Sequence, residues 1–387
     1  MLLRLNMNKA MSEVNNDSSK LSSPPIGGGQ GASFWQAAWR RLKKNKGAMV
    51  GLVMIIIAIL IAIFGYFLSP DPSPFANRII LEIGGERPGY TRQFLLVRKD
   101  RTTETGFFTR LTSGKPDNVE YIPITSHQES NDSIIVQKYI DEGVTERMAY
   151  AKASLANDPV VEKKFYAGTD KYGRDILSRL IIGTRVSLSV GLITVVISLS
   201  VGILLGAVAG YFRGRVDNIV MWLINVIWSI PTLLLVFAIT LLLGKGFWQV
   251  FIAVGLTMWV NVARLVRGQV MVTRELQYVE AAKVLGFSHL RIIALHILPN
   301  IFGPILVIAA SNFASAIVIE AGLSFLGVGV QPPQPSWGLM IKENYNFIIT
   351  QNPMLALAPG FAIMLLVLSF NLLGNGLRDA LNVRGRI

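Results

Sequence analysis

Six long runs without a charged residue constrain this chain more than any other feature. The first, residues 48–68, would cover about 31 Å as an α-helix, which matches the hydrocarbon core of a bilayer. A charge at mid-membrane costs roughly 2.5–3.5 kcal/mol, so uncharged runs of this length predict transmembrane helices. The other five are residues 187–211, 218–243, 247–263, 301–319 and 354–373. We therefore predict an all-α polytopic membrane protein with six transmembrane helices.

The overall composition supports lipid contact. Hydrophobic residues make up 51% of the chain and charged residues only 16%, whereas soluble domains carry about 25% charged residues. The net charge of +13 could indicate nucleic-acid binding, but the basic residues cluster beside the apolar runs, as membrane anchors do. The chain has no cysteine, which excludes disulfides and thiolate chemistry, and its three histidines are scattered, so we expect no metal site.

The short loops predict the orientation. With both termini in the cytoplasm, the inner side carries fifteen basic residues, against only Lys245 and Lys342 in the short outer loops. This bias follows the positive-inside rule. The inner residues include five before the first run and then Arg213, Arg215, Arg264, Arg267, Arg274, Lys283, Arg291, Arg378, Arg384 and Arg386.

Composition divides the chain into segments. Residues 1–33 are rich in Ser, Asn and Gly and predict a disordered cytoplasmic tail. Residues 34–47 carry two tryptophans followed by five cations, which is typical of an interfacial amphipathic helix. Residues 69–186 form a long extracytoplasmic insert between the first and second helices. The remaining residues, 187–387, form a core of five transmembrane helices with a cytoplasmic loop at 264–299.

The insert is too polar for lipid and should fold by itself. Residues 78–83, 93–98 and 118–125 are β-like and bounded by Gly and Pro, whereas residues 142–155 read as a helix. We therefore predict a small mixed α/β subdomain within residues 69–165.

The loop at 264–299 contains the most informative motif. Tyr278, Ala281, Ala282 and Leu285 recur on one helical face, while Glu280 and Lys283 stay polar. Gly286 suits a helix C-terminus, Ser288 can cap the next short helix, and Pro299 should end that helix before the fifth span. These residues predict two short helices across the membrane face, open to docking by another protein. From the residues alone, an ordinary amphipathic loop helix is the alternative.

The spacing of this motif resembles the Glu-Ala-Ala loop of ABC importer permeases. That pattern is Glu-Ala-Ala, three residues, Gly, nine residues, then Ile, any residue, and Leu-Pro; here His296 replaces the isoleucine. The resemblance implies that this loop docks in a cleft of a cytoplasmic ATPase and transmits its nucleotide-driven closure to the helices. The residues implied in coupling are Glu280, Ala281, Ala282, Gly286, Leu298 and Pro299.

Two further stretches narrow the resemblance. Residues 168–188 precede the second span, and residues 323–338 follow the fifth; both are similar to the C-type permease of the dipeptide/oligopeptide/nickel importer family. Read without the family, the alternating acids and arginines of the first stretch predict a salt-bridged turn that caps a helix. An aspartyl-protease pair is the poorer alternative. The residues of this extracytoplasmic motif are Asp170, Gly173, Arg174, Asp175 and Arg179.

Polar residues within the spans are candidates for the transport pathway or its gate, because burial in lipid is costly for them. The candidates are Asn225, Ser229, Asn261, Asn312 and Glu320. For the small hydroxyl residues, helix–helix packing is the commoner explanation. Pro231 predicts a kink, and the spacing of Gly202, Gly206 and Gly210 predicts close helix packing.

The chain lacks a phosphate-binding loop of the Gly-x-x-x-x-Gly-Lys-Ser/Thr type, so we expect it not to hydrolyse ATP. The resemblance implies a non-catalytic permease subunit in a bacterial inner membrane. Its partners would be a homologous permease, two ATPases that bind ATP and Mg²⁺, and an extracytoplasmic solute-binding protein, with no cofactor in this chain. Peptides are the expected substrate, and nickel or another small solute is the alternative. An ATP-independent secondary transporter is a weaker rival, since no internal repeat is present.

Overall fold

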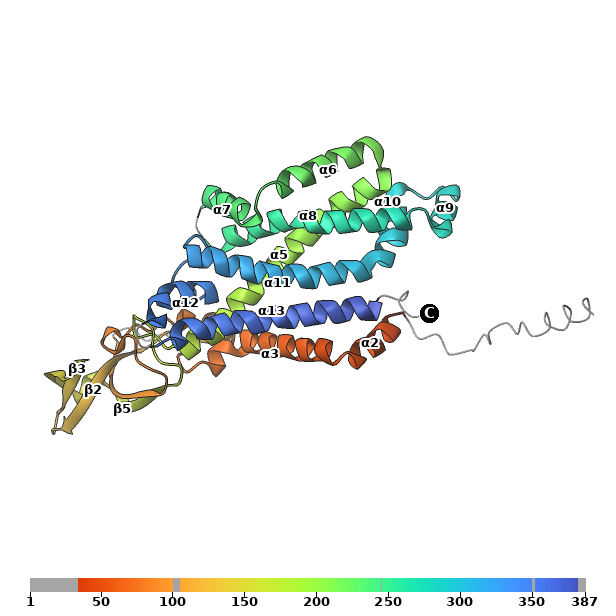
Figure 1. Ribbon diagram of the computed structural model, residues 1–387. Helices are drawn as coiled ribbons and strands as arrows, with labels where there is room; N and C mark the ends of the chain where they lie inside the picture. Colours follow the sequence, from red (N-terminus) through yellow and green to blue (C-terminus); the bar gives the residue numbers. More distant parts are fainter. Residues whose placement is uncertain (1–33, 100–104, 245, 350–351, 382–387) are drawn as a thin grey trace, which may run out of the picture.

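The computed structural model describes residues 34–99, 105–244, 246–349 and 352–381. Helices dominate this part of the chain and form an elongated bundle with a β-sheet at one end (Figure 1). Five helical segments are long and apolar enough to cross a bilayer. They are α3 (Lys46–Leu68), α5 (Ile176–Phe212), α8 (Phe247–Thr273), α11 (Phe302–Leu326, with the turns before it) and α13 (Met354–Leu381).

The third predicted span is not one helix. It consists of α6 (Gly214–Trp228) and α7 (Thr232–Leu243), whose axes meet at 91°. Pro231 lies at the N-terminal boundary of α7, where its missing N–H interrupts the helical hydrogen bonds. The predicted kink is therefore a full break, and the described helices amount to six spans only if this pair is counted as one.

Two spans extend beyond the uncharged runs. Helix α5 begins at Ile176, so the predicted boundary between insert and core at residue 186 falls inside a helix. Helix α8 continues past Ala263 to Thr273 and includes Arg264 and Arg267. The uncharged runs predicted only the apolar part of α5 and of α8. Each helix is longer than its run because it also contains arginines that form hydrogen bonds.

Helices α5 and α8 pack closely along a row of glycines, as the sequence predicted. A Cβ atom on Gly202 would lie 2.5 Å from the Cβ of Val262, and one on Gly206 would lie 2.5 Å from the carbonyl oxygen of Ala263. A Cβ on Gly210 would lie 2.7 Å from a carbonyl oxygen of α8. These distances are too short for any side chain, so the glycines fix the separation of the two helices.

The insert contains a five-stranded antiparallel sheet in the order β4-β3-β2-β1-β5. Its strands are β1 (Tyr90–Arg98), β2 (Val119–Glu129), β3 (Ser133–Asp141), β4 (Val144–Ala151) and β5 (Leu155–Phe165). The predicted strand at 93–98 lies within β1, and the one at 118–125 overlaps β2 from Val119 onward. A short helix, α4 (Phe107–Ser113), lies between β1 and β2.

Two predictions for the insert were wrong. Residues 142–155, predicted to be helical, form β4 and the turns beside it, because Gly143 at a φ of 78° closes a hairpin that pairs β4 with β3. Residues 78–83, predicted to be a strand, form an irregular segment that ends in a 3₁₀ turn, Leu81–Ile83. Their apolar side chains Ile80 and Ile83 are buried against Phe94 and Phe165 of the sheet without joining it.

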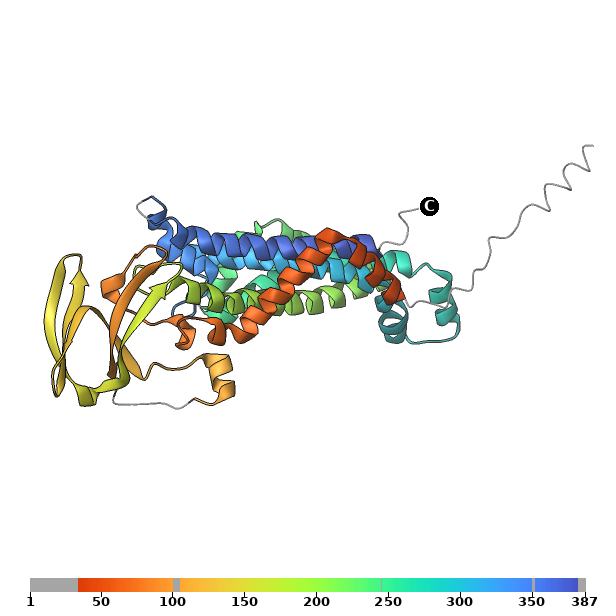
Figure 2. The same cartoon turned by 90° about the horizontal axis from the view of Figure 1, so that it is seen from below.

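The sheet and the loop at 264–299 lie at opposite ends of the bundle (Figures 1 and 2). We call these the sheet end and the loop end. The loop end also carries α2 (Phe34–Lys44), where Leu42 packs with Ala380 near the end of α13. The predicted tail at residues 1–33 lies outside the described residues.

Candidate functional site

The loop end carries a short helix, α9 (Gln277–Val284), followed by α10 (His289–Arg291). Two side chains on one side of α9 hold it to the bundle: Val279 is fully buried and Ala282 is 4% exposed. Both belong to a cluster with residues of α5 and α8, including Val266 and Val270. The helix is thereby fixed against the ends of α5 and α8.

The opposite side of α9 is open. Glu280 and Ala281 are exposed, as are the apolar side chains of Tyr278 at 41%, Val284 at 89% and Leu285 at 72%. The sequence predicted that Tyr278, Ala281, Ala282 and Leu285 share one face of the helix. In the structure these four residues do not form one surface, because Ala282 is buried and the other three are exposed. An exposed surface of this kind, apolar with one carboxylate, suits a protein partner.

Gly286 ends α9 in a left-handed conformation with a φ of 79°. The N–H of Gly286 donates to the carbonyl of Lys283, and the N–H of Phe287 donates to that of Ala282, which is the Schellman pattern of a helix end. Within the described part of the chain, no atom beyond the adjacent residues lies within 4 Å of the place where a Cβ would stand. The backbone angle, and not crowding, is therefore the reason for glycine here.

The path from α10 into α11 is continuous, which corrects the prediction that Pro299 ends a helix. Ser288 caps α10 through its hydroxyl, and a π-helical turn, Ile292–Ile297, and a 3₁₀ turn, Leu298–Ile301, follow. Pro299 is accommodated because it occupies the first turn of the 3₁₀ segment, where its missing N–H is not needed. Leu298 packs against the buried cluster while Pro299 is exposed.

Polar contacts tie this loop to α5. The hydroxyl of Tyr211, near the end of α5, lies 2.9 Å from Nδ1 of His289. Arg274 donates to the backbone carbonyl of Tyr211, and Tyr278 donates to the carbonyl of His296 at 3.4 Å. A force on α9 or α10 therefore reaches α5 and α11 through direct contacts.

The five predicted pathway residues do not lie together. Asn225 and Asn261 face one cluster on α6 and α8, in which the indole N–H of Trp228 donates to Asn261 at 3.3 Å. The guanidinium of Arg264 stacks 3.6 Å from the Trp228 ring and donates to Asn225 at 3.4 Å. No carboxylate in the described part of the chain pairs with Arg264, and its Nε has no partner there. Trp228 and Arg264 were not predicted.

A cavity of about 410 Å³ opens beside this cluster. Its walls come from α6, α7, α8, α11 and α13. The polar residues that line it are Trp228, Thr232, Thr257, Asn261, Ser315 and Asn371. Of the five predicted pathway residues, Asn261 is the one that lines this cavity. Ser229, at the break between α6 and α7, bonds instead to the carbonyl of Val226 at 2.7 Å.

The other two candidates lie in packed interiors. Asn312 is 3% exposed and donates to the hydroxyl of Ser198 on α5 at 3.4 Å. Glu320 is 1% exposed and accepts from Ser324 at 2.6 Å, while Ser324 accepts from the N–H of Val330. These contacts hold α11 to α5 and to the loop that follows α11, so neither side chain lines the cavity.

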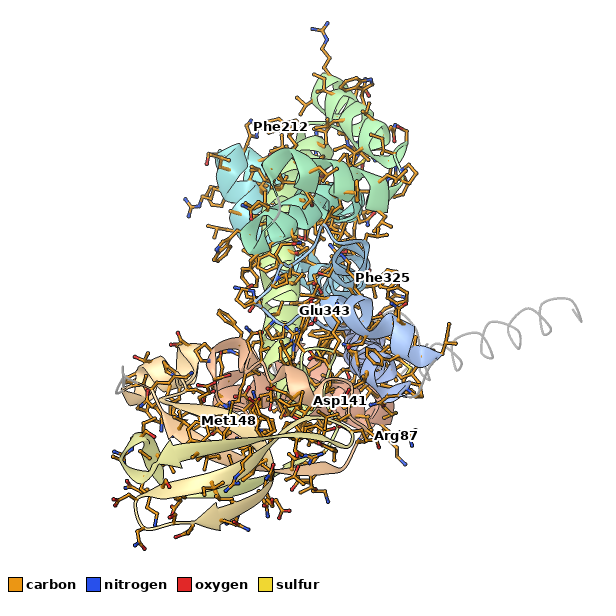
Figure 3. All side chains as sticks on the ribbon, turned by 90° about the vertical axis from the view of Figure 1, so that its left-hand side faces the viewer. Arg87, Asp141, Met148, Phe212, Phe325 and Glu343 are labelled. Atoms are coloured by element: carbon orange, nitrogen blue, oxygen red, sulfur yellow. The ribbon has the colours of Figure 1, made fainter. Side chains whose placement is uncertain are left out.

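At the sheet end, the motif of Asp170 to Arg179 forms a buried ion network. Arg174 and Arg179 contact Oδ2 of Asp170 at 2.7 and 2.6 Å, and both contact Oε2 of Glu343 at 2.8 and 3.0 Å. Glu343 lies on α12 (Trp337–Asn344), among the helices at the sheet end (Figure 3). The network joins the start of α5 to α12, and its second carboxylate was not predicted.

Among the described residues Asp175 pairs with no arginine, although the salt-bridged turn predicted for this motif included it. It caps α5, accepting from the N–H of Ser178 at 2.9 Å, and burial raises the pKa of its carboxyl above the ordinary value. Gly173, at a φ of 71°, lets the turn press against the carbonyl of Ile80, where a Cβ would stand 1.7 Å away. The turn is therefore specific to glycine at this position.

Comparison with known proteins identifies the chain. The dipeptide transport system permease protein DppC of Bacillus subtilis (strain 168) is 32% identical over 374 residues, which are 97% of this chain and 91% of that protein. Residues 202–386 match the family described as the binding-protein-dependent transport system inner membrane component. This chain belongs to that family of permeases. Residues 33–80 also match the N-terminal TM domain of oligopeptide transport permease C.

Other relatives of the permease agree with this assignment. The dipeptide transport system permease protein DppC of Alkalihalophilus pseudofirmus is 34% identical and covers 93% of both chains. The di/tripeptide transport system permease protein DppC of Pseudomonas aeruginosa is 43% identical over 57% of this chain and 73% of that protein. Within the family, the permease is a C-type subunit of the dipeptide and oligopeptide group, a multi-pass membrane protein and not itself the catalytic component.

Proposed function

We propose that this permease forms half of the translocation pathway of an ATP-driven peptide importer. It works in a bacterial inner membrane beside a second, homologous permease, and peptides are the substrate because its relatives carry dipeptide and oligopeptide names. Two cytoplasmic ATPases bind ATP and Mg²⁺ and hydrolyse the nucleotide. An extracytoplasmic solute-binding protein delivers the peptide.

Helix α9 and the sheet lie at opposite ends of the bundle, and this arrangement is the main support for the proposed role (Figures 1 and 2). With six spans and both termini in the cytoplasm, the loop end faces the ATPases and the sheet end faces the binding protein. The broken pair α6 and α7 then counts as one span. In the short loops, the excess of basic residues on the side of the loop end supports this orientation, whereas the long insert, which is itself basic, carries little weight because long loops cross a membrane regardless of charge.

Coupling runs through the open side of α9. Glu280, Ala281 and the exposed apolar residues beside them contact the ATPase, while Val279 and Ala282 transmit the movement into the bundle. Gly286 keeps the helix end in place, and the turns at Leu298 and Pro299 carry the movement into α11. Two ATPase-driven positions of this loop then switch the pathway between its outward and inward states.

The pathway passes the cavity lined by Trp228 and Asn261. Arg264 supplies a positive charge beside it that no described side chain neutralises, which suits the carboxylate of a peptide. Asn225 orients the guanidinium, and Ser229 marks the hinge between α6 and α7. Asn312 and Glu320 serve as packing residues next to the pathway.

The test is a bulky substitution on the open side of α9. Ala281→Trp should fold, because Ala281 is exposed, and should reduce uptake by the reconstituted complex at least about tenfold by blocking the docking surface. Ala282→Trp would be a poorer test, since Ala282 is buried and the change would disturb the loop itself. Thr145→Trp, an exposed position at the sheet end, is the matched control. Equal uptake by the two variants would contradict the coupling role.

A further inference from the structure

Helix α4 (Phe107–Ser113) presents two aromatic side chains to the outside of the molecule. Phe107 is 61% exposed and Phe108 is 79% exposed. Adjacent aromatic residues so exposed on a seven-residue helix are costly in water. We therefore expect another apolar surface to cover Phe107 and Phe108.

The position of α4 indicates what that surface is. The helix belongs to the insert by sequence, but it lies beside the outer part of α3 and not beside the sheet (Figure 2). The rings of Phe107 and Phe67 are 5.5 Å apart, and the guanidinium of Arg110 stands 4.6 Å from the Phe67 ring. Phe67 occupies the last turn of α3, the first membrane-spanning helix. Helix α4 therefore sits at the level where α3 leaves the apolar layer.

This placement is fixed by contacts on both sides of α4. Arg185 of α5 donates to the carbonyls of Leu111 and Thr112 at 3.1 and 3.2 Å, which caps the end of α4. Gly114, which directly follows α4, packs against Tyr66 of α3; a Cβ on this glycine would lie 2.8 Å from the Tyr66 ring. The helix is thus clamped to two spans and cannot turn its aromatic side elsewhere without breaking these contacts.

The exposed surface of α3 runs into that of α4. Phe64, Phe67 and Leu68 are 44%, 37% and 56% exposed on the outside of α3, where a membrane-spanning helix meets lipid. Phe107 and Phe108 continue this apolar surface. Arg110 adds a cation beside it, as is usual at the depth of the headgroups.

We propose that α4 lies in the interface of the outer leaflet, with Phe107 and Phe108 inserted into lipid, and holds the sheet at a fixed height above the membrane. This inference rests on the proposed function in one respect, the extracytoplasmic position of the insert. It requires neither ATPase coupling nor a peptide substrate. Its failure is therefore distinguishable from failure of the transport role.

The experiment uses the natural absence of cysteine. Phe108→Cys is labelled with the environment-sensitive fluorophore NBD in the full chain, reconstituted in phosphatidylcholine/phosphatidylglycerol vesicles. We expect blue-shifted emission, strong quenching by lipids that carry a nitroxide near the headgroup, and at least about threefold weaker quenching by aqueous iodide than for NBD at Thr145→Cys. Thr145 is an exposed position on β4 and serves as the control.

Two results would overturn the proposal. One is NBD emission and iodide quenching at position 108 equal to those at position 145. The other is a label that stays in water in vesicles and becomes shielded only when the solute-binding protein is added, which would make α4 a protein-docking surface. Phe107→Cys is the second variant, so that a local folding defect at one position does not decide the outcome.

Discussion

The hydroxyl of Tyr211 lies 2.9 Å from Nδ1 of His289, so the end of α5 and the start of α10 share a hydrogen bond. Tyr211 is 4% exposed and also packs in the cluster that holds Val279 and Ala282. This contact joins the docking loop to the helix that runs the full length of the bundle. It adds a polar contact to the apolar packing of Val279 and Ala282 against the same helix.

Removal of that hydroxyl should weaken coupling. A hydrogen bond contributes about 0.5–1.5 kcal/mol, so Tyr211→Phe should reduce peptide uptake per ATP hydrolysed by roughly 2–10-fold while the subunits still assemble. Uptake and ATP hydrolysis are measured on the same reconstituted complex. Tyr166→Phe is the control, because Tyr166 is 63% exposed beside the sheet and takes no part in the loop. Equal coupling ratios in the two variants would show that the bond has no such role.

Cysteine accessibility should separate pathway residues from packing residues. Asn261→Cys lines the cavity and should react with a small water-soluble thiol reagent, and a transported peptide should slow this reaction. Asn312→Cys, the matched asparagine, should react at least about tenfold more slowly, because position 312 is packed against α5. Faster labelling at 312 than at 261 would place the pathway elsewhere.

The buried ion network should be a large contributor to stability. Glu343→Gln leaves Arg174 and Arg179 with Asp170 as the one carboxylate of the described residues that they contact, so one buried positive charge is uncompensated. Breaking a buried pair costs about 3–5 kcal/mol, and the unfolding midpoint of the purified permease should fall by several degrees. Lys152→Gln removes an exposed pair with Glu129 and should change the midpoint little. A similar midpoint for the two variants would contradict this account.

Lys163 on β5 predicts a pH dependence. Burial lowers the pKa of its ammonium to about 8, with the nearby Arg78 acting in the same direction. The unfolded chain keeps its proton up to about pH 10.5, so it binds more protons than the folded chain between these values, and stability gained from Lys163 rises with pH across that window. Below pH 8 the folded state carries the buried charge.

Lys163→Met removes this titration. The variant should exceed the natural chain in unfolding midpoint at pH 7.5, and the difference should shrink as the pH rises from 8 to 10. The difference between the two proteins is the quantity to follow, since other groups titrate equally in both. A difference that is constant with pH would mean that Lys163 titrates at its ordinary value.

Those parts of the fold that depend on local sequence patterns could be predicted from the sequence. Uncharged apolar runs located five long apolar helices and the broken pair α6 and α7, and the spacing of Gly202, Gly206 and Gly210 located the contact between α5 and α8. The turn at Gly286 was also predictable, since a glycine at the end of an apolar helical pattern needs no distant partner. The ends of spans were less predictable, because arginines such as Arg264 continue a helix when they find partners.

Features that depend on residues far apart in the chain were missed. The pairing of β4 with β3 overrode the helical appearance of residues 142–155. Glu343 is separated by more than 160 residues from the arginines it binds, and no local pattern marks it. Trp228 and Arg264 likewise become neighbours only because α6 folds back along α8. Arg264 directly follows the uncharged run 247–263, and this position at the edge of a span was the sequence signal that could have singled it out.

Docking of α9 on the ATPase would bring the two proteins into reach of a short cross-linker. Ala281→Cys, the one cysteine in this chain, should form a cross-link with an ATPase subunit through a short thiol-to-amine reagent in membranes that contain the complex. Thr145→Cys, at the sheet end, should form none. The account predicts a permease–ATPase product for position 281 that increases or decreases when ATP is added. Absence of that product at 281 in an assembled, transport-active complex, or its appearance at 145, would contradict it.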